Sequence, residues 1–152
     1  MNYRVPFEVT EIKMIYRNRI KAADRPQITS SQDAYMILFS NWSEQIGFIE
    51  EFYILLLDRA NRVMARYLVS QGGLAGTVVD AKVIFAAAIK GRASSVILSH
   101  NHPSGSLRPS QADIDLTAKL REAGKILEIL ILDHLILSPE GGYYSFADEG
   151  LM

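Results

Sequence analysis

The sequence contains no cysteine. This excludes disulfide bonds and every zinc site built on thiolates, including the His/Cys/Cys site of nucleobase deaminases. Long apolar runs are also missing, since none approaches about 18 residues, and no N-terminal stretch has the pattern of a signal peptide. We therefore expect a cytoplasmic protein without a membrane partner.

The chain also has no large excess of basic or of acidic residues. The chain has 16 basic and 17 acidic residues, which gives a formal net charge of −1. A protein without a basic field is not expected to bind nucleic acid through phosphate neutralisation alone. Residues 1–30 hold six basic and three acidic side chains, a balance typical of a solvated face, with nucleic-acid contact as the less favoured alternative.

The length of 152 residues and the hydrophobic content of 49% suit one sizeable core. Apolar runs typical of strands alternate with helical patterns, which predicts an α/β fold with a mixed β-sheet flanked by helices. Strands are expected over 9–16, 52–57, 63–69, 95–98, 125–132, 135–137 and 143–144, and helices over 31–42, 81–88 and 110–124.

Two histidines follow the short apolar run Ser95–Leu98, which is typical of a buried strand. Residues two apart on a strand face the same way, so His100 and His102 should present their imidazoles side by side. A catalytic zinc ion takes three protein ligands and leaves its fourth position to water. The pair therefore predicts a metal site that needs a third ligand.

Asp113 is the first choice for that ligand. On the helix expected from Ser110 it begins the stripe Asp113, Leu116, Thr117 and Leu120, so its carboxylate should face inward. A buried carboxylate is costly unless it is paired or bound to a metal. The alternative is that Ser110 and Asp113 only cap the helix, and the two roles are compatible.

His134 is the second choice for the third ligand. It lies after Asp133, between two apolar runs. A histidine in that setting is more often a core residue whose ring is hydrogen-bonded to a neighbouring aspartate or to a backbone carbonyl.

The spacing of His100, His102, Ser110 and Asp113 resembles the signature of the JAMM (MPN+) metalloproteases. The longer motif formed by His-Asn-His-Pro-Ser-Gly and Pro-Ser-Gln-Ala-Asp resembles the bacterial RadC family. The chain matches the JAB domain of that family from about Ile46 to Tyr144. The resemblance implies a JAB/MPN architecture, similar to cytidine deaminases, over residues 46–152. From the sequence pattern, we expect residues 1–45 to form a strand and a helix that pack on that core. The helix-hairpin-helix region of longer RadC proteins has no counterpart in residues 1–45.

The resemblance also implies an activity and the residues that perform it. It implies one Zn²⁺ per chain, bound by His100, His102 and Asp113, and hydrolysis of a peptide or isopeptide bond in a peptide or protein substrate. Glu50 would activate water, with Glu51 on the opposite face of its strand as the runner-up, and Ser110 would hydrogen-bond the oxyanion. The alternatives are a RadC-like protein associated with DNA repair or replication, and a metal-stabilised binding module without turnover.

Overall fold

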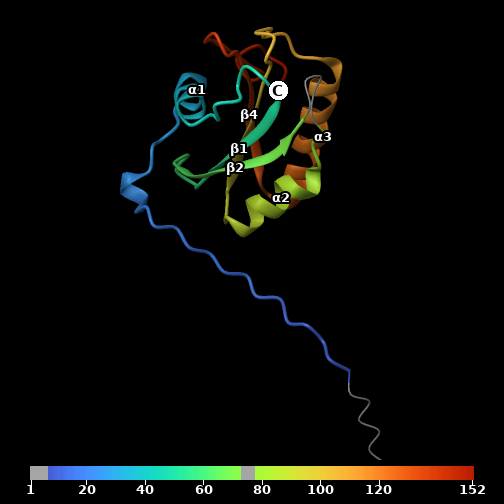
Figure 1. Ribbon diagram of the computed structural model, residues 1–152. Helices are drawn as coiled ribbons and strands as arrows, with labels where there is room; N and C mark the ends of the chain where they lie inside the picture. The colour runs from blue at the N-terminus through green and yellow to red at the C-terminus, as the bar shows by residue number, and fades with distance from the viewer. Residues whose placement is uncertain (1–6, 73–77) are drawn as a thin grey trace, which may run out of the picture.

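A five-stranded β-sheet with helices on both faces forms the body of the protein in the computed structural model, which describes residues 7–72 and 78–152 (Figure 1). The mixed α/β fold predicted from the sequence is thus confirmed. The elements, in chain order, are a 3-10 turn Ala22–Asp24, α1 Ser31–Ser40, β1 Glu51–Leu57, β2 Val63–Gln71, α2 Ala81–Lys90, β3 Ser95–Asn101, α3 Gln111–Leu127, β4 Leu130–Leu137 and β5 Tyr143–Ser145.

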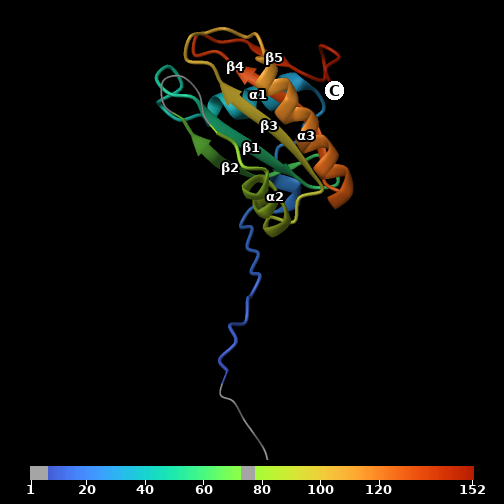
Figure 2. The same ribbon diagram turned by 90° about the vertical axis from the view of Figure 1, so that its right-hand side faces the viewer.

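The strand order β2-β1-β3-β4-β5 places the histidine-bearing strand β3 at the centre of the sheet (Figure 2). β3 runs antiparallel to β1 and parallel to β4, while the other neighbouring pairs are antiparallel. The register sets Phe52 opposite His100 on the β1 side and Ile136 opposite His100 on the β4 side. The central position explains why β3 is buried along its whole length.

Side chains alternate between two hydrophobic cores, one on each face of the sheet. Along β1, Ile54 and Leu56 pack with α2 and α3, while Leu55 and Leu57 pack with α1. On β3, Leu98 joins the α2/α3 face. By this alternation, even-numbered residues at the ends of β1 and β3 face α3.

The junction between α3 and β4 differs from the sequence expectation. Strands over 125–132 and 135–137 were predicted, but α3 continues to Leu127 and a single strand, β4, spans Leu130–Leu137. From the sequence, Gly124 was expected to end the helix. In the structure it lies inside α3, and the absence of a side chain lets the chain after the helix approach closely, so that the backbone N–H of Ile129 donates to the Gly124 carbonyl at 2.9 Å. The helix ends instead at Glu128, whose φ of 57° is left-handed.

The strand expected over residues 9–16 is not formed. This segment is exposed and pairs with no strand of the described chain, because its extended backbone runs away from the sheet (Figure 1). Over the described residues, none of the helices combines the length and apolar character required to cross a membrane.

Candidate metal centre

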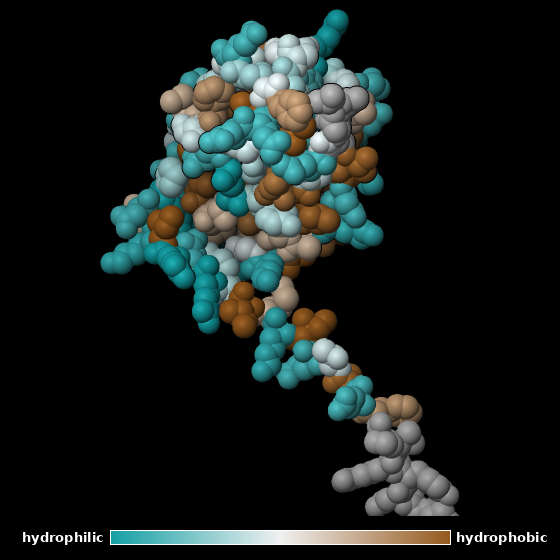
Figure 3. All heavy atoms as spheres, viewed as in Figure 1, coloured by the Kyte–Doolittle hydropathy of each residue, from teal (hydrophilic) through white to brown (hydrophobic). Residues whose placement is uncertain are grey.

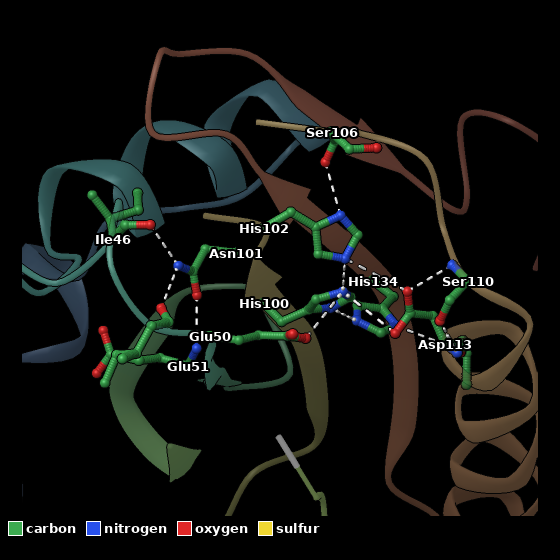
Figure 4. Close-up of polar contacts among 12 residues, drawn as sticks. Ile46, Glu50, Glu51, His100, Asn101, His102, Ser106, Ser110, Asp113 and His134 are labelled. Carbon is green, nitrogen blue, oxygen red and sulfur yellow. Dashed lines mark hydrogen bonds and ion pairs between the residues drawn. The ribbon is translucent and has the colours of Figure 1, made fainter. Parts of the chain in front are cut away.

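Three potential metal ligands meet where β3 ends and α3 begins (Figure 4). The Nε2 atoms of His100 and His102 are 3.0 Å apart. Asp113 places Oδ1 3.4 Å from His100 Nε2 and Oδ2 3.7 Å from His102 Nε2. Ligand atoms bound at about 2.0–2.1 Å to one tetrahedral zinc ion lie about 3.3 Å apart, so these separations fit a shared ion.

The hydrogen bond of the second imidazole fixes its tautomer. His102 Nδ1 lies 2.8 Å from the backbone oxygen of Ser106. A carbonyl only accepts, so Nδ1 carries the proton and donates it. In the neutral ring, Nε2 therefore has a free lone pair that points at Asp113 and His100.

A buried chain of hydrogen bonds fixes the tautomer of His100 in the same way. Thr117 Oγ1 donates to the backbone oxygen of Asp113 at 2.6 Å, and so accepts from His134 Nδ1, also at 2.6 Å. His134 Nε2 is then an acceptor, and His100 Nδ1 donates to it at 2.8 Å. The Nε2 atom of His100 is left with a lone pair facing the site.

His134 therefore contacts the Nδ1 atom of His100 and not the Nε2 atom that faces the carboxylates (Figure 4). Both of its ring nitrogens are engaged by His100 and Thr117. The expectation that Asp133 or a backbone carbonyl would satisfy the ring is wrong, because Asp133 accepts from the backbone N–H of His134 at 2.7 Å instead. Complete burial lowers the pKa of His134 well below its usual value, which keeps the ring neutral.

Four acceptors consequently converge with no hydrogen between them: two imidazole lone pairs and the carboxylates of Glu50 and Asp113. Such a cluster is unfavourable unless a cation joins it. The donor set of nitrogen and carboxylate oxygen is one that zinc accepts, as do other divalent metals. The residues present thus fit a bound divalent metal ion.

Asp113 is held in place by the start of α3. Its Oδ2 atom accepts from the backbone N–H of Ser110 at 2.8 Å, and Ser110 Oγ accepts from the backbone N–H of Asp113 at 3.1 Å. This reciprocal capping box stabilises the first turn of the helix. Capping uses one carboxylate oxygen and leaves Oδ1 to face His100, so the two roles coexist in one side chain.

Glu50 stands on the other side of the histidines, immediately before β1. Its Oε1 atom is 4.0 Å from His100 Nε2. Ligand atoms of Glu50, His100 and His102 lie within 4.8 Å of one another, so this trio is also a possible metal-binding group. The carboxylate of Asp113 lies closer to His100 Nε2 than the carboxylate of Glu50 does.

Asn101, which the sequence reasoning did not single out, clamps the backbone on both sides of Glu50. Its Nδ2 donates to the backbone oxygens of Ile46 and Ile49 at 2.7 and 2.9 Å. Its Oδ1 accepts from the backbone N–H of Glu51 at 2.7 Å. The signal available in the sequence was a polar side chain between two histidines, at the end of an apolar strand.

Glu51 is fully buried on the opposite face of the sheet. Its carboxylate accepts hydrogen bonds from Ser43 and, at 2.8 Å, from Gln71. The structure therefore brings Glu50, but not Glu51, to the histidines.

The carboxylates and imidazoles of the cluster shift one another's pKa values. Burial acts to raise the pKa of Asp113, but the neighbouring imidazoles of His100 and His102 and the backbone N–H of Ser110 outweigh it and hold that pKa well below its usual range. The nearby carboxylate of Asp113 raises the pKa of His102, and burial opposes the shift. Burial raises the pKa of Glu50, against the opposing effect of the two histidines. Of the two carboxylates at the site, Glu50 is thus the one whose pKa is raised.

A cavity of about 300 Å³ adjoins the site. Glu50, His100 and Asp113 lie at one part of its wall, and Phe52, Val79 and Leu116 among others form apolar parts. The structure therefore has a partly apolar cavity directly beside the cluster.

Comparison with known proteins identifies a family and several relatives of the chain. A family model described as a RadC-like JAB domain matches residues 28–151. Proteins named UPF0758 are similar: that of Flavobacterium johnsoniae is 47% identical over 127 residues, covering 82% of this chain and 53% of the relative. Those of Porphyromonas gingivalis and Methanosarcina mazei are 39% and 40% identical, covering 84% and 83% of this chain and 56% and 54% of the relatives. The chain spans about half the length of these relatives.

Proposed function

The chain belongs to the family of RadC-like JAB domains, and from this premise we propose that it is a zinc-dependent hydrolase that cleaves a peptide or isopeptide bond in a peptide or protein substrate. One observation carries the proposal. Two imidazole lone pairs and two carboxylates converge beside a cavity, with every Nδ1 proton committed elsewhere. The resemblance to JAMM metalloproteases supplies the reaction class.

The residues divide into ligands and groups that handle the proton and the developing charge. His100, His102 and Asp113 would hold one Zn²⁺ per chain, which when bound supplies a Lewis acid for the substrate carbonyl and lowers the pKa of water. Glu50 takes a proton from the attacking water and returns it to the leaving nitrogen. Its separation of 4.0 Å from His100 Nε2 suits a group that contacts the water rather than the ion.

Ser110 would stabilise the oxyanion of the tetrahedral intermediate. Its Oγ lone pair accepts from the backbone N–H of Asp113, while the hydroxyl proton donates to no other residue that the structure describes. A hydroxyl held by a helix start is preorganised for charge that develops during the reaction.

Amide hydrolysis suits this site better than phosphodiester hydrolysis. Nucleases and phosphatases frequently use two metals about 3.5–4 Å apart, with shells rich in carboxylates. In the part of the chain that the structure describes, only one metal-ligating group is found, and two of its members are histidines.

The test is incubation of zinc-loaded protein with a library of linear peptides and lysine-linked isopeptides, and separately with single- and double-stranded DNA. We expect zinc-dependent cleavage in the peptide library, lowered by roughly 10²–10⁴ in Glu50→Gln, and intact DNA. Glu51→Gln is the matched control and should retain activity.

Two other results would identify the alternatives. Zinc-dependent DNA cleavage that disappears in Glu50→Gln would replace the peptidase proposal with a role in DNA repair or replication. Full metal content with no cleavage of either substrate would favour a metal-stabilised binding module.

A further inference from the structure

The cavity beside the metal centre has a polar part and an apolar part. Its polar lining consists of Glu50, His100 and Asp113. Its apolar lining consists of Phe52, Val78, Val79, Ala112 and Leu116. Apolar side chains are also exposed along the N-terminal segment that leaves the body (Figure 3). The cavity differs from that segment because its apolar walls directly adjoin a cluster of potential metal ligands.

Phe52 connects the apolar part of the cavity to the metal centre. It lies opposite His100 in the pairing of β1 with β3. The two rings are stacked, with centroids 5.9 Å apart and an angle of 3° between their planes. Phe52 is 2% exposed, so core packing fixes its position. An apolar group bound against this ring would lie beside the imidazole that is expected to hold the ion.

The start of α3 supplies both a ligand and apolar walls. Residues three apart lie on one face of a helix, so Asp113 and Leu116 face the same side, and both line the cavity. Leu116 and Val79 also pack against the hydrophobic core that the sheet forms with α2 and α3. The apolar walls are thus held in place by the core.

We propose that the cavity takes one aliphatic side chain of the substrate, that of a residue directly next to the scissile bond; this rests on the proposed function. The volume of about 300 Å³ is at the lower end of the roughly 300–1,000 Å³ of small-molecule sites, which suits a single side chain. A charged side chain in the apolar part would lose water and meet no polar side chain there. The substrate is therefore a peptide with leucine, isoleucine or methionine at that position.

Alkyl hydroxamates of increasing chain length test the pocket without requiring turnover. The hydroxamate group binds zinc through its two oxygen atoms, and the alkyl chain then extends away from the ion. We expect the affinity of the zinc-loaded protein to rise by about fourfold for each methylene added between acetohydroxamate and hexanohydroxamate, because the chain enters the cavity. Titration calorimetry measures the series.

Two substitutions change the walls without removing a ligand. Ala112→Leu fills part of the cavity and should abolish most of the gain in affinity from acetohydroxamate to hexanohydroxamate. Val79→Thr keeps the shape of the side chain but adds a hydroxyl, and should reduce that gain in part. Ala118→Leu is the matched control, because it makes the same change at an exposed residue of α3 outside the cavity lining. It should leave the whole series unchanged.

The peptide library provides a second readout. Cleaved bonds should be flanked by leucine, isoleucine or methionine in the unchanged protein, and by glycine or alanine in Ala112→Leu. Cleavage without a preference at that position overturns the pocket.

The hydroxamate series separates the pocket from the hydrolase. An affinity that does not rise with chain length, or that rises equally in Ala112→Leu, overturns the pocket even where peptides are cleaved. So does a zinc-loaded protein that does not bind hexanohydroxamate. The expected rise without cleavage of any peptide supports the aliphatic pocket and contradicts the hydrolase instead.

Discussion

The Nδ1 atom of His100 donates a hydrogen bond of 2.8 Å to the Nε2 atom of His134. This contact fixes the ring of His100 with its other nitrogen toward Asp113 and explains why His134 is buried without reaching the site itself. Outer partners of metal-bound histidines typically fix the tautomer and raise the basicity of the ligand.

Replacement of His134 should weaken metal binding without removing a ligand. We expect His134→Ala to lower zinc affinity by roughly 10–100-fold while still binding one ion at saturation. Thr117→Val, which removes the acceptor of His134 Nδ1, should weaken binding less. Competition with a chelator measures both affinities, and failure of His134→Ala to bind zinc at any concentration would make His134 a ligand.

Loss of the Asn101 clamp should affect catalysis more than metal content. Asn101→Ala removes three hydrogen bonds that hold the backbone around Glu50, so the carboxylate loses its fixed position. We expect full zinc content and a kcat lowered by about tenfold or more, with a smaller change in KM. An unchanged kcat would show that Glu50 is positioned by other contacts.

Much of this arrangement was predictable from the sequence, because local patterns determine it. The run Ser95–Leu98 and the two histidines beyond it predicted a buried strand with both imidazoles on one side, and the structure has them there. The alternation of Glu50 and Glu51 across β1 was likewise predicted. Each of these predictions rests on the two-residue period of a strand.

Contacts between distant segments were not predictable in the same way. His134 and Thr117 are 17 residues apart and Asn101 and Ile46 are 55 apart, and no local pattern pairs them. The strand expected over 9–16 failed for a related reason, since a strand needs a partner and the sequence does not say whether one is supplied.

Gly124→Ala should destabilise the protein, although alanine usually stabilises a helix by about 1 kcal/mol relative to glycine. A Cβ at position 124 would clash with the backbone oxygen of Ile129. The resulting strain should cost about 1–3 kcal/mol in the free energy of unfolding. Urea unfolding measures it, with the exposed Lys119→Ala on the same helix as the control. An increase in the free energy of unfolding would show that the backbone of the turn after α3 can move to accommodate the added Cβ.

Asp58 should make stability depend on pH in the acidic range. Burial acts to raise its pKa, but hydrogen bonds from the backbone N–H groups of Arg62 and Ala60 and the contact with Arg25 outweigh it, so the pKa is lowered. A lowered folded pKa means that ionised Asp58 stabilises the fold above the unfolded pKa of about 3.9, and that this stabilisation is lost as the pH falls through the folded pKa. Thermal unfolding of Asp58→Asn should show a lower Tm at pH 7 and a smaller difference at pH 3. An equal difference at both pH values would contradict the assignment.

The most direct test of the metal site is the zinc content of the purified protein and four variants, measured by mass spectrometry after dialysis against a weak chelator. We expect about one zinc ion per chain in the unchanged protein and in Glu50→Gln, and almost none in His100→Ala, His102→Ala or Asp113→Ala. Zinc retained by Asp113→Ala and lost from Glu50→Gln would make Glu50 the third ligand and contradict its role as the base. Full zinc content in His102→Ala would contradict the site altogether.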